Sequence, residues 1–121
     1  MNINNDPQWI EVDVVGETTK RKYFGKFYVK PYLTLREQSD AEQLAGLYTR
    51  GLPDTPLKDI LWAVGKLKFH IIKFEADWWK GASDGVGEGL ELFEASPVHK
   101  LVTLVNAMQL PKEENSEPTS T

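Results

Sequence analysis

The chain lacks cysteine altogether, and this absence excludes several kinds of site at once. Disulfide bonds, thiolate zinc sites, iron–sulfur clusters and cysteine nucleophiles all need the side chain that is missing. Long apolar runs are missing too, because the longest uncharged apolar stretch, residues 60–65, is far shorter than the ~18 residues that a membrane span requires. Residues 1–6 show neither a basic start nor an apolar stretch, so we expect no signal peptide and a cytoplasmic protein.

The composition that remains is that of one folded domain. Of the 121 residues, 40% are hydrophobic and 11% aromatic, and the formal net charge is only −4. Such a chain can bury enough apolar surface to fold. The end of the sequence differs, because residues 111–121 contain no apolar side chain larger than proline. We therefore expect a single domain over residues 1–110, followed by a disordered acidic tail over residues 111–121.

Two stretches near the start alternate between apolar and polar residues, which is typical of β-strands with one buried face. They are residues 8–15 and 23–30, and a polar loop that begins at Gly16 separates them. The pattern predicts an antiparallel β-hairpin over about residues 8–30, in which Glu11 and Asp13 face lysines of the second strand. The side chains expected to point inward are Ile10, Val12, Val14, Tyr23, Phe27 and Val29.

Three later segments carry helical signals, so the predicted fold is α+β: an N-terminal antiparallel hairpin followed by a three-helix, mainly α-helical part. The first helix is expected over about residues 35–50, between a capping box at Thr34 and a glycine stop at Gly51. The second is expected over about residues 56–79 and has the clearest apolar stripe in the chain. The third is expected over about residues 97–109.

The second of these helices is apolar on more than one side. Trp62 and Phe69 are seven residues apart and lie on a different side from the main stripe. A helix with two apolar faces is either central to the fold or in contact with a partner. The sequence leaves both interpretations open for these two residues.

Side chains that could carry catalysis are few and scattered. His70 and His99 are far apart in the sequence, and neither has a second ligand-type residue at metal spacing. The glycine-rich stretch over residues 81–89 is acidic and lacks the Gly-Lys-Ser/Thr ending of a phosphate-binding loop, so we expect a flexible linker there. We therefore expect a protein that is no enzyme, with no catalytic residue, no metal site and no cofactor.

Charged residues of opposite sign gather in two regions. Residues 75–95 hold six acids and one lysine, whereas residues 20–30 hold five basic groups and no acid. These regions can attract each other within one chain or between two chains, so a homo-oligomer stays open. Because the pI is about 5.2 and no recognition helix accompanies the basic run, we expect a solvated hairpin tip, with no nucleic-acid or membrane partner. The charged contact patch in this hypothesis is Lys20, Arg21, Lys22, Lys26 and Lys30.

The adjacent tryptophans Trp78 and Trp79 lie at the end of the second predicted helix. Neighbouring side chains on a helix cannot share one face, so we expect one ring to be buried and the other exposed. An exposed aromatic ring is a recognition candidate. Together with the second apolar side of the helix, this gives a hypothetical partner-binding set of Trp62, Phe69, Trp78 and Trp79.

Three short motifs stand in order along the chain. They are Gly-Glu-Thr followed by Tyr-x-Gly-x-Phe over residues 16–27, Leu-x-Leu-Arg-Glu-Gln over residues 33–38, and the tryptophan pair before the glycine-rich loop. With these motifs, residues 9–108 resemble the tail assembly chaperone proteins of long-tailed bacteriophages.

The resemblance implies a non-catalytic function in the host cell cytoplasm. Such chaperones bind the tape-measure protein, keep its apolar helices in solution, help to recruit tail-tube protein, and leave before the tail is finished. The resemblance therefore implies the tape-measure and tail-tube proteins as partners, and absence from the mature virion. The alternative is a small virion structural protein, a tail or neck component that multimerises through its hairpin.

Overall fold

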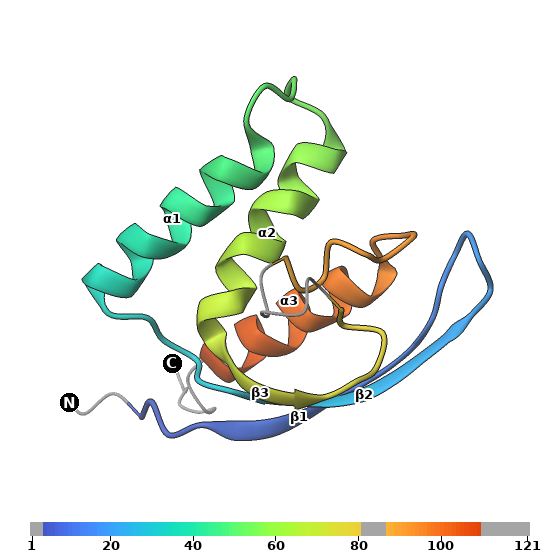
Figure 1. Cartoon of the computed structure of the whole chain (residues 1–121). Coiled ribbons are helices and arrows are strands. Elements are labelled where there is room, and N and C mark those ends of the chain that lie inside the picture. The colour runs from blue at the N-terminus through green and yellow to red at the C-terminus, as the bar shows by residue number, and fades with distance from the viewer. Residues whose placement is uncertain (1–3, 81–86, 110–121) are drawn as a thin grey trace, which may run out of the picture.

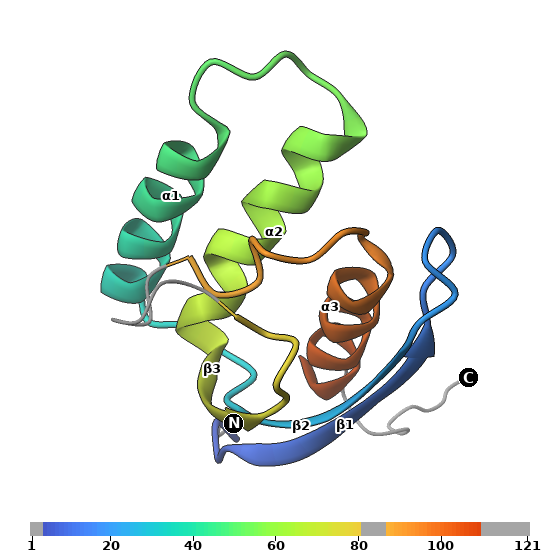
Figure 2. The ribbon, with the colours of Figure 1, turned by 45° about the vertical axis from the view of Figure 1, so that its right-hand side comes forward.

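The structure is a computed structural model, and it describes residues 4–80 and 87–109. Its elements in chain order are β1 (Gln8–Val15), β2 (Lys22–Val29), α1 (Leu35–Thr49), α2 (Pro56–His70), β3 (Ile71–Glu75) and α3 (Ser96–Gln109). The three strands form one antiparallel sheet in the order β1-β2-β3, and α3 packs across it (Figure 1). Helix α2 lies between α1 and α3 (Figure 2). The predicted α+β class is confirmed, whereas the acidic tail and most of the glycine-rich linker lie outside the described residues.

The predicted hairpin forms, and its alternation sets which face is buried. Glu11 lies opposite Lys26 in the register, as predicted, whereas Asp13 lies opposite Phe24 and forms a 3.6 Å ion pair with Lys22. The inward row of β2 is fully buried, and that of β1 is buried at Val12 and half-buried on either side. Rows of alternating side chains therefore place the core between the sheet and the helices.

The predicted second helix is too long, because α2 ends at His70 and the chain continues as β3. At this junction the Lys30 N–H donates to the His70 carbonyl at 2.9 Å, so the edge of β2 takes over the hydrogen bonding. Ile71 and Phe74 pack against the core from this strand. Over so short a run, β-branched and aromatic residues fit the sheet, and apolar spacing alone does not separate a strand from a helix.

Small residues bring α1 and α2 close together. The Thr34 and Glu37 capping box forms as predicted, but the buried residues of α1 are only Ala41, Ala45 and Thr49. A Cβ placed on Gly65 of α2 would lie 2.7 Å from the Ala45 Cα. The rest of α1 is largely exposed, which agrees with its thin apolar face.

Candidate protein-binding surfaces

The structure buries both adjacent tryptophans, so the expectation that one of them is exposed is wrong. Trp78 is 7% exposed and Trp79 is 2% exposed. The reason is that residues 76–79 form a turn, closed by the Trp79 N–H on the Ala76 carbonyl at 3.1 Å, and the helical argument does not apply to a turn. Both rings pack against Phe27, at centroid distances of 5.5 and 5.7 Å.

Trp78 also completes the sheet. Its indole Nε1–H donates to the Phe24 carbonyl at 2.9 Å. This carbonyl lies past the last residue of β3, since Glu75 pairs with Lys26. The indole therefore supplies the donor that a longer third strand would have supplied, and we assign Trp78 to folding and not to partner binding.

Trp62 and Phe69 are half-buried, so each keeps part of its ring in contact with solvent. Trp62 stands at the edge of a groove between α2 and α3. These two residues stay candidates for partner binding, whereas the tryptophan pair does not.

The groove between α2 and α3 consists of two adjoining hollows of about 310 Å³ each. Asp59, Ala63 and Val102 line both hollows, so the two form one channel along the helices. The hollow nearer the starts of α2 and α3 is lined mainly by apolar side chains, and polar groups gather at the other end near His70. The walls are Pro56, Ile60, Trp62, Lys66, Leu67 and His70 from α2, and Val98, His99, Val105, Asn106 and Gln109 from α3.

The two histidines hold separate positions. The His70 Nδ1 lies 2.8 Å from the Lys30 carbonyl, and burial lowers the pKa of its imidazole below the usual 6.5. His99 is exposed, on the first turn of α3. No group of three or more His, Asp or Glu side chains in the described parts of the chain could hold a metal ion.

The five basic residues of the proposed contact patch are dispersed over the hairpin and partly paired. The Lys30 ammonium binds Glu37 of α1, and this hydrogen bond lowers the pKa of the Glu37 carboxyl. The Arg21 guanidinium lies 5.7 Å from the centre of the Tyr23 ring, and Lys26 lies between Glu11 and Glu75 in the register. Because Lys30 is at the end of β2 away from the loop, the five do not form one continuous patch.

The acidic region, residues 75–95, does contact the hairpin loop. The contact is made by Glu94, which accepts hydrogen bonds from the hairpin and does not pair with its lysines. The Thr18 and Thr19 N–H groups donate to Glu94 Oε1 at 2.7 and 3.1 Å, and the Tyr23 hydroxyl donates to Oε2 at 2.7 Å. The Thr19 hydroxyl also donates to this carboxylate. These hydrogen bonds, the Thr19 hydroxyl first, lower the pKa of Glu94 to about 2 although partial burial opposes them.

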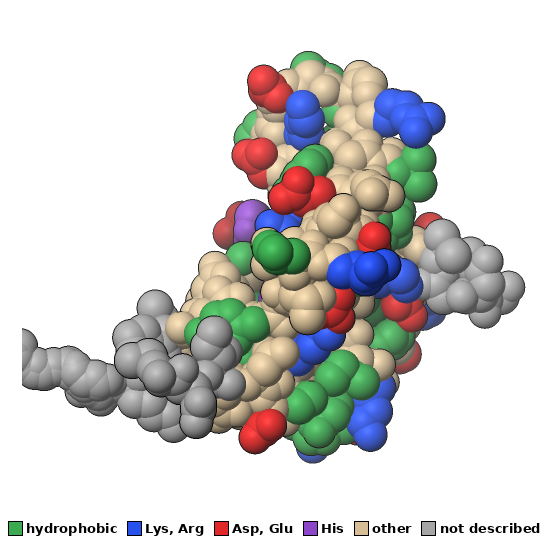
Figure 3. Space-filling model, turned by 90° about the vertical axis from the view of Figure 1, so that its left-hand side faces the viewer, with side chains coloured by type: hydrophobic (Ala, Val, Ile, Leu, Met, Phe, Trp, Pro, Cys, Tyr) green, Lys and Arg blue, Asp and Glu red, His purple; other side chains and the backbone are tan. Residues whose placement is uncertain are grey.

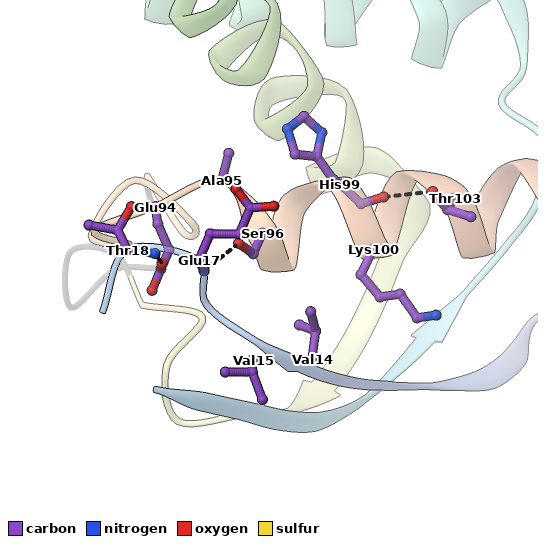
Figure 4. A pocket seen from close by; sticks show the side chains of 10 residues that line it. All are labelled: Val14, Val15, Glu17, Thr18, Glu94, Ala95, Ser96, His99, Lys100 and Thr103. Carbon is purple, nitrogen blue, oxygen red and sulfur yellow. Dashed lines mark hydrogen bonds between the residues drawn. The ribbon is translucent and has the colours of Figure 1, made fainter. Parts of the chain in front are cut away.

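A cavity of about 650 Å³ lies between the end of β1 and the start of α3, beside Glu94 (Figure 4). Val14 and Val15 line it from the strand, and His99, Lys100 and Thr103 line it from the helix. Near its edge the Glu17 N–H donates to Ser96 Oγ at 3.2 Å. Sequence reasoning missed this cavity, because its two walls are far apart in the chain.

Sequence reasoning also missed Trp9, which is 45% exposed on the outer face of the sheet. Its ring lies 5.2 Å from that of Tyr28, and the Lys73 Nζ lies 5.6 and 5.2 Å from the two ring centres. The signal was present, because Trp9 falls on the side of the strand opposite Ile10 and Val12.

On the α1 side of the molecule, hydrophobic side chains appear in separate places among charged ones (Figure 3).

No helix within the described residues is both long enough and apolar enough to cross a membrane. Comparisons with protein-family models, curated proteins and solved structures found no match to this chain.

Proposed function

We propose that this protein is a non-catalytic chaperone of bacteriophage tail assembly, which holds an apolar helix of the tape-measure protein in the groove between α2 and α3. In this proposal the protein works in the host cell cytoplasm, helps to recruit tail-tube subunits and leaves before the tail is complete. The family is proposed from the motifs in residues 16–38 and from the tryptophan pair Trp78 and Trp79, and the binding site is proposed from the groove.

The observation that carries the proposal is the apolar lining of the groove on both sides. Ile60 and Ala63 of α2 and Val102 of α3 line the groove and keep part of their surface exposed. Leu67, Val98 and Val105 are nearly fully buried and form its floor. Two helices with apolar side chains between them form a surface onto which a third amphipathic helix can pack. This mode of binding needs no reactive side chain.

The affinity that this groove can supply suits temporary holding. Full burial of one large apolar side chain contributes about 1.5–3 kcal/mol, and a half-buried ring such as that of Trp62 has only part of this left to gain. The cost of association and of side-chain ordering reduces the sum of a few such contacts. A client held in this way can be released when tail-tube subunits compete for it.

The motif residues have a different role, which is consistent with a shared fold. Gly16, Thr18, Thr19 and Tyr23 surround the Glu94 carboxylate, and a Cβ on Gly16 would collide with it. Gly25 leaves room for Ala76, because a Cβ there would lie 2.5 Å from the Ala76 Cβ. The first motif therefore holds the hairpin against the segment before α3. In this proposal, other residues bind the partner.

Co-expression with the client tests the proposal. The tagged protein is produced together with the large helical protein encoded beside it, and the soluble and co-purified client is measured. We expect the wild type to retain the client, and Trp62→Ser or Ala63→Glu to lower the retained amount at least about tenfold, because ~1.4 kcal/mol corresponds to tenfold in affinity. Leu47→Ser is the matched control, since Leu47 is 54% exposed on α1 away from the groove.

Two results would contradict the proposal. One is a client that stays insoluble with the wild type, or that Trp62→Ser and Ala63→Glu variants with unchanged thermal unfolding retain fully. The other is a defined number of copies of this protein in purified particles, which is what a virion structural component requires.

A further inference from the structure

We propose that the open edge of β1 binds an extended, basic segment of another protein by adding it to the sheet as a fourth strand. This surface is separate from the α2 and α3 groove, and the proposal does not depend on the identity of the client held there.

The backbone of β1 offers the hydrogen bonds for such a strand. The Gly16 N–H donates to the Arg21 carbonyl at 2.8 Å, which makes Gly16 and Arg21 a hydrogen-bonded pair. In an antiparallel ladder such pairs alternate, so Val14, Val12 and Ile10 also bond to β2. The intervening residues direct their N–H and C=O groups away from the sheet.

These outward-directed residues are Trp9, Glu11, Asp13 and Val15, at one edge of the strand order β1-β2-β3. Within residues 4–80 and 87–109 no strand pairs with this edge. The next residue of the same parity, Glu17, already has its N–H bonded to Ser96 Oγ at 3.2 Å. The open edge therefore begins at Val15, the residue of the same parity before Glu17. An unpaired edge is a template for another strand.

The negative charges on this edge of β1 favour a partner strand that carries basic residues. On the outer face β1 carries two exposed carboxylates, Glu11 and Asp13, and no basic residue. The nearest cation to Asp13 is Lys22 at 3.6 Å, in an exposed pair that holds it weakly. A strand with lysine or arginine at two alternate positions would place a cation beside each carboxylate.

The same charges disfavour antiparallel pairing of β1 with β1 of a second copy of this chain. Every antiparallel register that overlaps three or more of the four outward-directed residues places a carboxylate directly opposite a carboxylate. Glu11 then faces itself, Glu11 faces Asp13, or Asp13 faces itself. Like charges directly opposite each other destabilise a strand pair, so the favoured occupant is a basic segment and not another β1.

The surroundings of β1 give the added strand side-chain contacts on both faces. On the outer face, Trp9 is 45% exposed and Val15 is 56% exposed, so both can gain contacts. On the inner face, the cavity of about 650 Å³ between β1 and α3 opens beside Val14 and Val15. Figure 4 shows Lys100 and Thr103 of α3 above this strand end, where an inward side chain of the partner would enter.

Peptide binding to the isotope-labelled full chain tests this proposal. The probe is a peptide as long as β1, which has 8 residues, with lysine at two alternate positions and threonine or valine elsewhere. We expect the indole N–H resonance of Trp9 to shift on titration while those of Trp78 and Trp79 stay in place. A peptide of the same composition with adjacent lysines should bind at least about tenfold more weakly, because its charges fall on opposite faces.

Two variants of equal charge separate the edge from general electrostatics. E11Q/D13N removes the two edge carboxylates and should weaken binding at least tenfold, whereas D40N/E42Q removes two exposed carboxylates of α1 and should leave binding unchanged. A peptide with N-methylated backbone at its pairing positions should not bind. The proposal is overturned if Trp9 does not respond, if both variants weaken binding equally, or if the N-methylated peptide binds as well. Dimerisation of the chain through β1 would also overturn it.

Discussion

The Tyr23 hydroxyl donates a hydrogen bond of 2.7 Å to the Glu94 carboxylate, across 71 residues of sequence. This contact joins the hairpin to the segment that leads into α3, and two backbone N–H groups and the Thr19 hydroxyl complete it. Burial and the Glu94 contact together raise the pKa of Tyr23. The hairpin loop is therefore organised around a carboxylate that the sequence supplies from its acidic region.

The first prediction concerns the pH dependence of stability. The hydrogen bonds from Thr19, Tyr23 and Thr18 lower the pKa of Glu94 to about 2, from 4.5 in an unfolded chain. Below pH 4.5 the unfolded state binds a proton at this residue and the native state does not, so the free energy of unfolding falls as the pH drops from 4.5 to about 2. Above pH 4.5 this contribution is fully present. Urea unfolding at a series of pH values measures it.

Glu94→Gln should be less stable at pH 7 and should show a shallower fall below pH 4.5, because glutamine does not titrate. Glu91→Gln removes an exposed carboxylate from the same segment and should change stability at pH 7 by less than about 0.5 kcal/mol. Equal acid sensitivity of wild type and Glu94→Gln would show that Glu94 does not fasten the hairpin.

The second prediction tests the assignment of Trp78 to folding. Trp78→Phe keeps an aromatic ring but leaves the Phe24 carbonyl without its donor. This hydrogen bond is partly buried, and a typical intramolecular hydrogen bond contributes about 0.5–1.5 kcal/mol, so the free energy of unfolding should fall by at least about 1 kcal/mol once the smaller ring's lost packing is added. Trp9→Phe is the control on an exposed ring and should cost less than about 0.5 kcal/mol. Similar costs for both variants would argue against the Trp78 hydrogen bond.

The third prediction uses two glycines of different surroundings. A Cβ on Gly65 would lie 2.7 Å from the Ala45 Cα, so Gly65→Ala should force α1 and α2 apart and cost about 1–3 kcal/mol. Gly46 of α1 has no atom within 4 Å of such a Cβ. Gly46→Ala should therefore stabilise the protein by about 0.5–1 kcal/mol, through the higher helix propensity of alanine. Opposite signs in thermal unfolding are the expected result, and a stabilising Gly65→Ala would contradict the close helix packing.

Local patterns predicted the elements that depend on neighbouring residues. The hairpin followed from alternation, and the start of α1 followed from the Thr34 capping box, because both signals act within a few residues. The stretch Ile71–Glu75 was misassigned because its apolar residues fit a helix and a strand equally well. The stretch forms a strand because it pairs with the edge of β2, which lies far away in the sequence.

The candidate sites were harder to predict because they depend on tertiary contacts. A helix through Trp78 and Trp79 predicts that one ring is exposed and available for recognition. The turn at residues 76–79 instead directs both rings into the core. Glu94 had no local signal, since its donors come from the hairpin loop. The sequence left open whether Trp62 is a core or a contact residue; the structure leaves it half-buried at the groove, and its role in binding stays a prediction.

The central claim is that the groove between α2 and α3 holds an apolar helix of the client, and the four tryptophans allow a direct measurement. Their indole N–H resonances report on the groove edge at Trp62, on the open edge of β1 at Trp9, and on the core at Trp78 and Trp79. A titration with a helical client peptide should shift the Trp62 resonance and leave the two core resonances in place. Binding of that peptide with an unchanged Trp62 resonance would contradict the account.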